Sequence, residues 1–295
     1  MKTLKGIFPP LATPFLNGEV AYDKLKENVK KLNEKELSGY VVFGSNGESV
    51  FLNTNEKLKL VSSAKEVAAK DKIVIAVTGS ESIRETISLT NAAAIEGADY
   101  ALILTPSYYK NSMDHQAMLD YFNAVADSIK IQMIIYNVPK FTGLSIEPKT
   151  VAQLAMHPNI VGLKNSNEDI AHTASIIKST PDEFITLIGT ASVLYPGLAL
   201  GCKGGILALA NIAPDECISI YKNCVDGNYD AAKNTQLKIM ELNKAVTARF
   251  GVAGLKAALD MLGYFGGEPM KPLRKLNEVQ LNELKEILIK AELKL

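Results

Sequence analysis

The sequence predicts an α/β protein, a (β/α)8 TIM barrel with a C-terminal helical extension. Short runs rich in Val, Ile and Leu alternate with longer segments whose apolar residues recur at three- and four-residue spacing, the pattern of alternating strands and helices. Most of the short runs are apolar on consecutive residues, as expected for strands of a parallel sheet that is buried on both faces. The 295 residues are 47% hydrophobic and 22% charged, which is ordinary globular composition.

Eight strands are predicted along the first two thirds of the chain, at residues 6–12, 39–44, 72–78, 100–105, 132–137, 160–164, 184–189 and 204–210. Helical periodicity lies between them, and several of these segments open at Asp, Asn, Ser or Thr caps, for example 22–36, 54–70, 82–96 and 114–126. Eight such units over residues 1–213 have the usual size of a closed barrel.

The last part of the chain has no strand candidates. Further helices are expected at 214–224, 228–246, 252–263 and 277–292. No Pro-, Gly- or Ser-rich linker separates them from the barrel. We therefore predict one domain, with a barrel over 1–213 and a helical extension over 214–295.

A doubly wound open sheet is the main structural alternative, because it uses the same alternation. Its usual signature is a glycine-rich phosphate loop after the first strand. Here the first strand is followed by ATPFLNGEV, and no G-x-G-x-x-G or Walker pattern stands between a strand and a helix. The barrel is therefore preferred.

Charge and hydropathy exclude several classes of partner. Lys plus Arg equals Asp plus Glu at 32 each, so we expect no nucleic-acid partner. The longest apolar runs are about half of the ~20 residues that a membrane helix needs, and the N-terminus does not have the pattern of a signal peptide. A cytoplasmic protein with no membrane association is expected.

No metal or organic cofactor is predicted. The cysteines are odd in number and lack metal-ligand or disulfide spacing, which fits core positions in a reducing compartment: Cys202, Cys217 and Cys224. The histidines are scattered and begin no metal motif: His115, His157 and His172.

Lys164 is the first candidate for chemistry, because active-site residues of such barrels follow the strands. It ends the apolar run 160–163, so its amine should emerge into a partly desolvated pocket. Desolvation disfavours the charged form of an amine and frees it to attack a carbonyl. From position alone, a lysine that only reaches solvent is an equal alternative.

Tyr136 ends the preceding strand. Neighbouring strands lie about 4.8 Å apart, so its phenol and the Lys164 amine could converge on one carbon atom. A tyrosine there could relay protons in Schiff-base chemistry, and the alternative is a tyrosine that only anchors the sheet edge.

A third candidate is the loop 44–49, with the sequence Gly-Ser-Asn-Gly-Glu-Ser after the second strand. Its backbone N–H groups could form a nest for a carboxylate. The same pattern also occurs wherever a strand turns tightly into a helix. After the fourth strand, Tyr108 and Tyr109 could line the site or pack in an interface.

These residues resemble the dihydrodipicolinate synthase and N-acetylneuraminate lyase family, the class I pyruvate-dependent aldolases. The resemblance spans essentially the whole chain. Its motifs are Gly-Ser-Asn-Gly-Glu-Ser at 44–49, Thr-Pro-Ser-Tyr-Tyr at 105–109, Tyr-Asn-Val-Pro at 136–139, Gly-Leu-Lys at 162–164 and Gly-Gly-Ile-Leu-Ala-Leu-Ala-Asn at 204–211.

The resemblance implies roles for the candidates. Lys164 would form the imine with a 2-oxo acid, with pyruvate as the substrate common to the family, and Tyr136 would shuttle protons. Ser45 would join a proton relay with Tyr136 and with Tyr109, which would reach across a tight dimer interface. The backbone of Ser45 and Asn46 would hold the pyruvyl carboxylate. The usual assembly of the family implies a homotetramer built from two tight dimers.

The same resemblance suggests the substrate-binding residues. Synthases of the family usually carry Tyr-Asn-Val-Pro-x-Arg-Thr-Gly, whose arginine grips a distal carboxylate, whereas this chain has Phe141 at the arginine position. Ile206, in the motif 204–211, is also placed among the substrate-binding residues. Ser166, two residues past the lysine, stands where 4-hydroxy-2-oxoglutarate aldolases also have serine, and with Asn46 it is predicted to hold the distal carboxylate.

The chain is therefore predicted to be closest to 4-hydroxy-2-oxoglutarate aldolase, and to cleave 4-hydroxy-2-oxoglutarate or a similar acid to pyruvate and an aldehyde. Stretches at 157–166, 245–256 and 263–267 also resemble that branch. Two alternatives within the family remain open: a synthase that condenses pyruvate with aspartate semialdehyde, and an aldolase acting on a sugar-derived 2-oxo acid. A non-catalytic barrel, in which Lys164 is inert, is the alternative outside enzymes.

Overall fold

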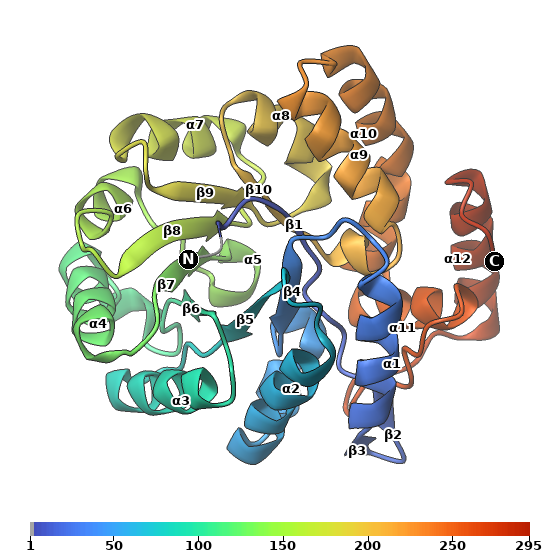
Figure 1. Ribbon diagram of the computed structural model, residues 1–295, viewed down its shortest axis with the longest axis horizontal. Helices are drawn as coiled ribbons and strands as arrows, with labels where there is room; N and C mark the ends of the chain where they lie inside the picture. Colours follow the sequence, from blue (N-terminus) through green and yellow to red (C-terminus); the bar gives the residue numbers. More distant parts are fainter. Residues whose placement is uncertain (1–2) are drawn as a thin grey trace.

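Eight parallel strands form the centre of the computed structural model, which describes residues 3–295 (Figure 1). They are β1 (Gly6–Phe8), β4 (Gly39–Val42), β5 (Ile73–Val77), β6 (Tyr100–Leu104), β7 (Met133–Asn137), β8 (Ile160–Asn165), β9 (Ile185–Ile188) and β10 (Gly204–Ile206). The hydrogen-bonded order is β1-β10-β9-β8-β7-β6-β5-β4. The predicted (β/α)8 barrel and its eight strands are confirmed.

The ring closes just beyond β1. Pro10 bridges Val41 in a parallel arrangement. The Leu11 N–H donates to the Val41 carbonyl at 2.8 Å, and the Val41 N–H donates to the Pro9 carbonyl at 3.0 Å. Neither proline has an N–H to donate, so the ladder here depends on the residues around them. This is why β1 is shorter than the predicted 6–12.

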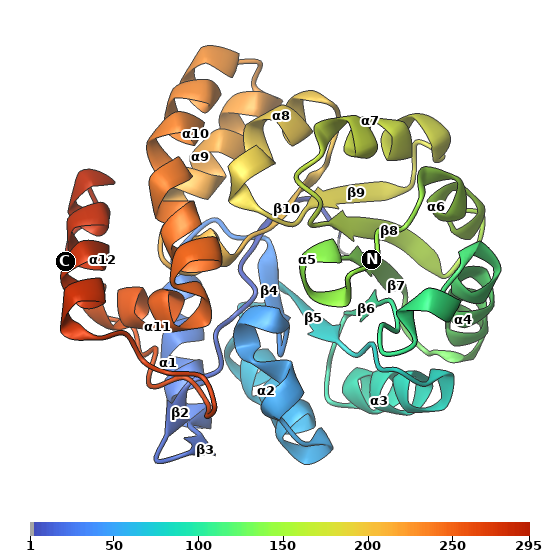
Figure 2. The same ribbon diagram turned by 180° about the vertical axis from the view of Figure 1, so that it is seen from behind.

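Helices surround the strands on the outside of the ring. They are α1 (Tyr22–Leu32), α2 (Thr54–Val67), α3 (Ile83–Ile95), α4 (His115–Ser128), α6 (Pro148–Leu154), α7 (Ile170–Ser179), α8 (Leu194–Ala199) and α9 (Pro214–Val225). A capping box explains where α2 begins, because the Asn53 side chain accepts from the Glu56 N–H while the Glu56 carboxylate accepts from the Asn53 N–H. The short helix α5 (Pro139–Thr142) lies over the centre of the ring when the molecule is seen from behind (Figure 2).

The rest of the chain is helical: α10 (Tyr229–Lys244), a π-helical turn (Ala245–Arg249), α11 (Gly251–Met261) and α12 (Glu278–Lys290). In Figure 1, α11 and α12 lie to the right, outside the ring of helices. The helix α9 contacts β1, so the chain just after residue 213 still covers the barrel. The division at residue 213 stays a prediction.

One small element is absent from the predictions. A hairpin of β2 (Phe15–Leu16) and β3 (Glu19–Val20) turns at Asn17 and Gly18, which both have positive φ angles of 54° and 82°. Strands of two residues are too short to show a period of two, but the Asn-Gly dipeptide is a strong hairpin signal. Phe15 also bridges Gly267, so the hairpin contacts the extension.

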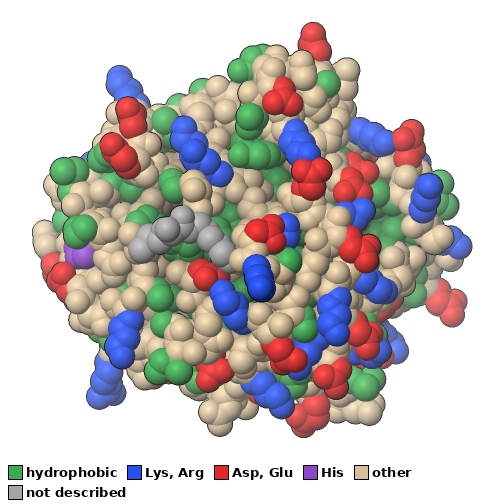
Figure 3. Space-filling model, in the orientation of Figure 1, with side chains coloured by type: hydrophobic (Ala, Val, Ile, Leu, Met, Phe, Trp, Pro, Cys, Tyr) green, Lys and Arg blue, Asp and Glu red, His purple; other side chains and the backbone are tan. Residues whose placement is uncertain are grey.

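The surface shown in Figure 3 has Lys and Arg side chains interspersed with Asp and Glu, as the balanced composition suggests. Within residues 3–295, no helix has the length and apolar character needed to cross a membrane.

Candidate active site

Tyr136 and Lys164 lie side by side at the ends of β7 and β8. The two strands pair in parallel with Tyr136 opposite Lys164. The Lys164 Nζ is 4.0 Å from the centre of the Tyr136 ring, a cation–π contact. Each residue is only 4% exposed. The structure therefore brings the two principal candidates together in a nearly dry environment.

The Tyr136 phenol is electrostatically unusual. Burial by itself raises its pKa, but the positive charge of Lys164 and the polar groups of Lys164, Ser45 and Ser166 beside it together bring the pKa below the ordinary 10.0. A phenol with a lowered pKa gives up its proton more readily, which suits a group that exchanges protons with reaction intermediates. The Ser166 Oγ is buried and has no hydrogen-bond partner among the described residues.

Buried amides fix the two strand ends. The Asn137 Nδ2 donates to the Asn165 Oδ1 at 2.8 Å, directly beside the Tyr136 and Lys164 pair. The Asn137 Oδ1 accepts from the Ile146 N–H, and the Asn165 Nδ2 donates to the Thr173 Oγ1. The sequence placed both asparagines beside the candidates at the strand ends, but it assigned neither of them a role.

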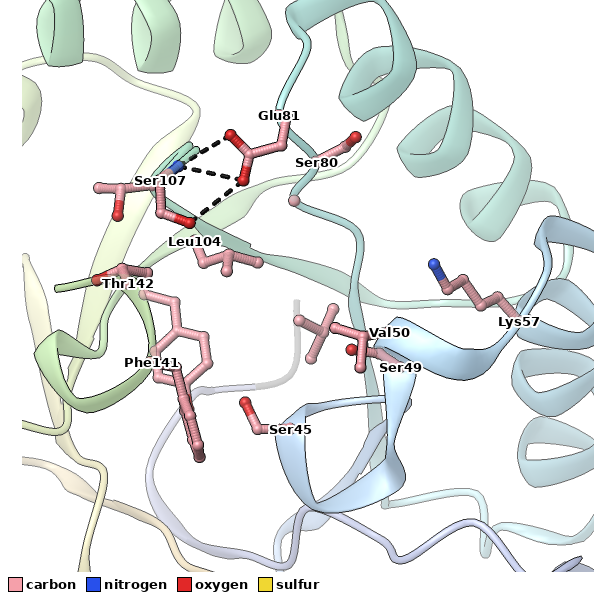
Figure 4. A pocket seen from close by; sticks show the side chains of 14 residues that line it. Ser45, Ser49, Val50, Lys57, Ser80, Glu81, Leu104, Ser107, Phe141 and Thr142 are labelled. Carbon is pink, nitrogen blue, oxygen red and sulfur yellow. Dashed lines mark hydrogen bonds between the residues drawn. The ribbon is translucent and has the colours of Figure 1, made fainter. Parts of the chain in front are cut away.

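The loop 44–49 follows β4 and starts with a 3-10 turn (Ser45–Gly47). Its first hydrogen bond runs from the Gly47 N–H to the Gly44 carbonyl at 2.9 Å, so this turn does not use the N–H groups of Ser45 and Asn46. Gly47 packs closely, since a Cβ there would lie 3.0 Å from the Leu11 carbonyl oxygen and that backbone would have to shift slightly. The Ser45 side chain points into the cavity (Figure 4), which Tyr136 also lines.

A cavity of about 470 Å³ opens at this end of the barrel (Figure 4). Its lining includes residues that the sequence analysis did not select: Lys57, Glu81 and Thr105. Burial lowers the pKa of Lys57. The Glu81 carboxylate accepts hydrogen bonds from the backbone N–H groups of Ser107 and Tyr108, and so fixes the loop after β6.

Ser166 and Ile206, both predicted to bind substrate, are buried in different parts of the barrel. The Ser166 N–H donates to the Asn137 carbonyl, and its side chain packs so tightly on Gly189 that a Cβ there would lie 1.9 Å from the Ser166 Oγ. Only glycine at 189 leaves room for this hydroxyl. Ile206 is fully buried at the end of β10 and pairs with Phe8 of β1.

Phe141 and Tyr109 are exposed. Phe141 is 63% exposed on α5 and lines the cavity. Tyr109 is 73% exposed and contacts Tyr108 edge to face, with ring centroids 5.0 Å apart. Within one chain, the exposed Tyr109 is therefore not part of a relay with Tyr136. The role predicted for Tyr109 across a dimer interface stays a prediction.

The Tyr136 phenol gives a direct test of this electrostatic environment. Subtracting the ultraviolet titration of Tyr136→Phe from that of the unaltered protein should give a transition with a midpoint below pH 10.0. Lys164→Met should move the midpoint above pH 10.0, because the cation that stabilises the phenolate is gone and the effect of burial remains. A midpoint that does not respond to Lys164→Met would contradict the coupling.

Comparison with known proteins defines the family. The model of the dihydrodipicolinate synthetase family matches residues 3–291. The chain belongs to this family. It is 34% identical over 288 residues to a protein of Methanothrix thermoacetophila named 4-hydroxy-tetrahydrodipicolinate synthase, covering 97% of this chain and 96% of that protein. A protein of Methanocaldococcus jannaschii with the same name is 34% identical over 285 residues, 96% and 97% of the two chains.

Solved structures of dihydrodipicolinate synthases have the same fold as this chain. The crystal structure of dihydrodipicolinate synthase from Aquifex aeolicus has a TM-score of 0.94 at 31% identity and covers 99% of each chain. The chloride-inhibited synthase from Acinetobacter baumannii, complexed with pyruvate, has a TM-score of 0.94 at 29% identity, covering 99% of this chain and 100% of that one. The chain is therefore an aldolase-type lyase of the dihydrodipicolinate synthetase family.

The prediction of 4-hydroxy-2-oxoglutarate cleavage is wrong. Relatives that are about one third identical over nearly the whole chain are named 4-hydroxy-tetrahydrodipicolinate synthase, which supports the synthase alternative. The error came from giving Phe141, Ser166 and the short stretches at 157–166, 245–256 and 263–267 too much weight. The Phe141 side chain lies on an exposed four-residue helix at the cavity mouth, so its identity leaves the buried Tyr136 and Lys164 pair unchanged.

Proposed function

We propose that this protein condenses pyruvate with aspartate semialdehyde to form 4-hydroxy-tetrahydrodipicolinate, through an imine on Lys164. The observation that carries the chemistry is the buried contact between the Lys164 amine and the Tyr136 ring at 4.0 Å. The names of the relatives support this choice of substrates, as does the pyruvate bound by the Acinetobacter protein.

The reaction follows from amine chemistry. The Lys164 amine adds to C2 of pyruvate and water leaves, which gives the protonated imine. Loss of a proton from C3 gives an enamine, and its C3 bonds to the aldehyde carbon of the second substrate, whose oxygen takes a proton. The amino group of that substrate then attacks C2, closes the ring and displaces Lys164. One water is released in total, and no oxidant or metal takes part.

Tyr136 supplies and removes protons in these steps. Its lowered pKa lets it act as acid and base, with the Ser45 and Ser166 hydroxyls as neighbours. The free N–H groups of Ser45 and Asn46 would bind the pyruvyl carboxylate. Ile206 would close the barrel side of the site and Phe141 its mouth.

The second substrate brings its own carboxylate, and Phe141 offers no charge to hold it. Phe141→Arg is therefore expected to lower the KM for aspartate semialdehyde on the order of tenfold, because a guanidinium pairs bidentately with a carboxylate. Phe141→Leu, which adds no charge, is the matched control. Steady-state kinetics with pyruvate saturating measure both, and an unchanged KM in Phe141→Arg would show that the substrate carboxylate binds elsewhere.

The decisive test of the reaction is incubation with pyruvate and aspartate semialdehyde, followed by mass spectrometry of the product. Consumption of both substrates with formation of the cyclic hydroxy acid is expected. Imine formation with pyruvate but no product with this aldehyde would overturn the proposed second substrate and retain the role of Lys164.

We further propose a cytoplasmic homotetramer built from tight dimers. The exposed Tyr108 and Tyr109 pair beside the site supports an interface there, since exposed aromatic pairs are typical of interface centres. In that assembly Tyr109 of one subunit would complete the relay of its neighbour.

A further inference from the structure

We propose that Lys256, in the C-terminal extension, is a positioning residue for the reaction, because its buried ion pair with Glu48 holds the loop 44–49 in place. That loop carries Ser45 and the N–H groups proposed to bind pyruvate, so the inference rests on the proposed function. The two residues are 208 positions apart in sequence, and neither is among the candidates for chemistry.

The pair is isolated from solvent. The Lys256 Nζ is 2.6 Å from the Glu48 Oε1, and both side chains are 1% exposed. The same ammonium donates to the Glu268 carbonyl at 2.9 Å and lies 4.3 Å from the centre of the Phe15 ring. Burial lowers the Lys256 pKa and the Glu48 charge opposes that shift. Among the described residues, the Glu48 Oε1 accepts no hydrogen bond, so the Lys256 ammonium stabilises it as an ion pair.

Glu48 is the point where the loop is fixed. It has a left-handed backbone conformation, with φ 58° and ψ 37°, which is uncommon for a residue other than glycine. Its N–H donates to the Ser45 carbonyl, and its Oε2 accepts from the Met270 N–H at 2.7 Å. A shift of the Glu48 carboxylate would therefore be transmitted to Ser45 through one turn of backbone.

Contacts within the C-terminal extension fix the position of Lys256. The Asp260 Oδ1 accepts from the Gly266 N–H at 2.7 Å, and a Cβ at Gly266 would lie 2.0 Å from the Lys256 carbonyl oxygen. Phe265 exchanges hydrogen bonds with the Asn28 side chain of α1. Lys256, Phe265 and Gly266 therefore help to support the active-site loop.

Removing one charge leaves the other buried without a partner, which is strongly unfavourable. If the Lys256 ammonium is lost, the Glu48 carboxylate can regain water only by moving outward, and the loop moves with it. Tyr136 and Lys164 stand on β7 and β8, whereas the ion pair joins the loop 44–49 to α11. The expected defect is in pyruvate binding and not in the reactive amine.

The test uses the full chain in four forms: unaltered, Lys256→Met, Glu48→Gln and the double variant Glu48→Gln/Lys256→Met. The readouts are the pyruvate concentration that half-saturates borohydride labelling of Lys164, and the Tm. Labelling needs only pyruvate, so failure of the second substrate does not affect it. Lys65→Met is the matched control, because the Lys65 partner Asp99 also accepts a backbone N–H, that of Val74, away from the site.

Lys256→Met is expected to raise the half-saturating pyruvate concentration on the order of 10- to 100-fold, with full labelling still reached at saturation. The double variant should recover Tm, since no unpaired charge remains, but should keep the raised pyruvate requirement. Lys65→Met should lower Tm without changing that requirement.

Recovery of pyruvate binding in step with Tm in the double variant would overturn the proposal, because the pair would then be purely structural. So would an unchanged pyruvate requirement in Lys256→Met. If Lys256→Met does not fold, the half-saturating pyruvate concentration and the Tm are compared in Glu48→Gln and in the double variant. The same outcomes then support or overturn the proposal. Absence of labelling in the unaltered protein would overturn the proposed imine instead.

Discussion

Lys164→Ala is expected to abolish labelling by pyruvate and borohydride and to lower condensation activity on the order of 10⁵-fold, as when a covalent nucleophile is removed. Only an imine becomes a permanent adduct on reduction, so the label identifies the reacting amine. Lys164 is 4% exposed and lies against Tyr136, and its removal leaves no amine in that position. Peptide mapping of the reduced protein should find the adduct on Lys164.

Lys57 provides the control for this experiment. It lines the cavity that Tyr136 also lines, and burial lowers the pKa of its amine, so on reactivity alone it is a rival for the imine. Lys57→Ala is expected to remain labelled on Lys164. Labelling that persists in Lys164→Ala and disappears in Lys57→Ala would transfer the imine to Lys57.

The barrel could be predicted because its signal is local and repeated. The strands from β4 to β9 consist mainly of consecutive apolar residues, as expected for a parallel sheet covered on both faces. The boundaries could not be predicted equally well. At β1, Pro9 and Pro10 follow an apolar run without an N–H to donate, so the run extends beyond the strand.

In the site, Tyr136 and Lys164 could be placed because the ends of neighbouring parallel strands lie together. Residues that act through contacts with distant parts of the chain could not be identified from the sequence. Glu48 was read as one member of a turn, and nothing near it in sequence indicates that its carboxylate meets Lys256 from another part of the chain. The tight contact between Gly189 and Ser166 is hidden for the same reason.

The substrate could not be predicted from Phe141 alone. A missing arginine removes one way of binding a carboxylate, and it does not show which other group binds it. The full-length similarity to the synthases combines many positions and therefore has more weight than one exposed side chain. The active-site chemistry is the same in both readings.

Tyr136→Phe is expected to keep the fold and to lower kcat by ~10²–10⁴-fold, the usual contribution of a general acid–base group. The change removes only the phenol oxygen, so the ring that packs 4.0 Å from the Lys164 amine is retained. What is lost is the group whose pKa is lowered, after burial is offset, by Lys164 and by the Ser45 and Ser166 hydroxyls.

The control variant removes a phenol oxygen from a tyrosine outside the candidate site. Tyr22→Phe acts on α1, where the ring is stacked by the Lys59 ammonium at 4.2 Å, and should leave kcat unchanged. Circular dichroism and Tm should match the unaltered protein for both variants, which separates a lost proton relay from a lost fold. Stopped-flow measurement with pyruvate alone then locates the defect. If imine formation and the overall rate both stay near normal in Tyr136→Phe, protons move through another group, and the Ser45 and Ser166 hydroxyls beside the phenol become the residues to replace next.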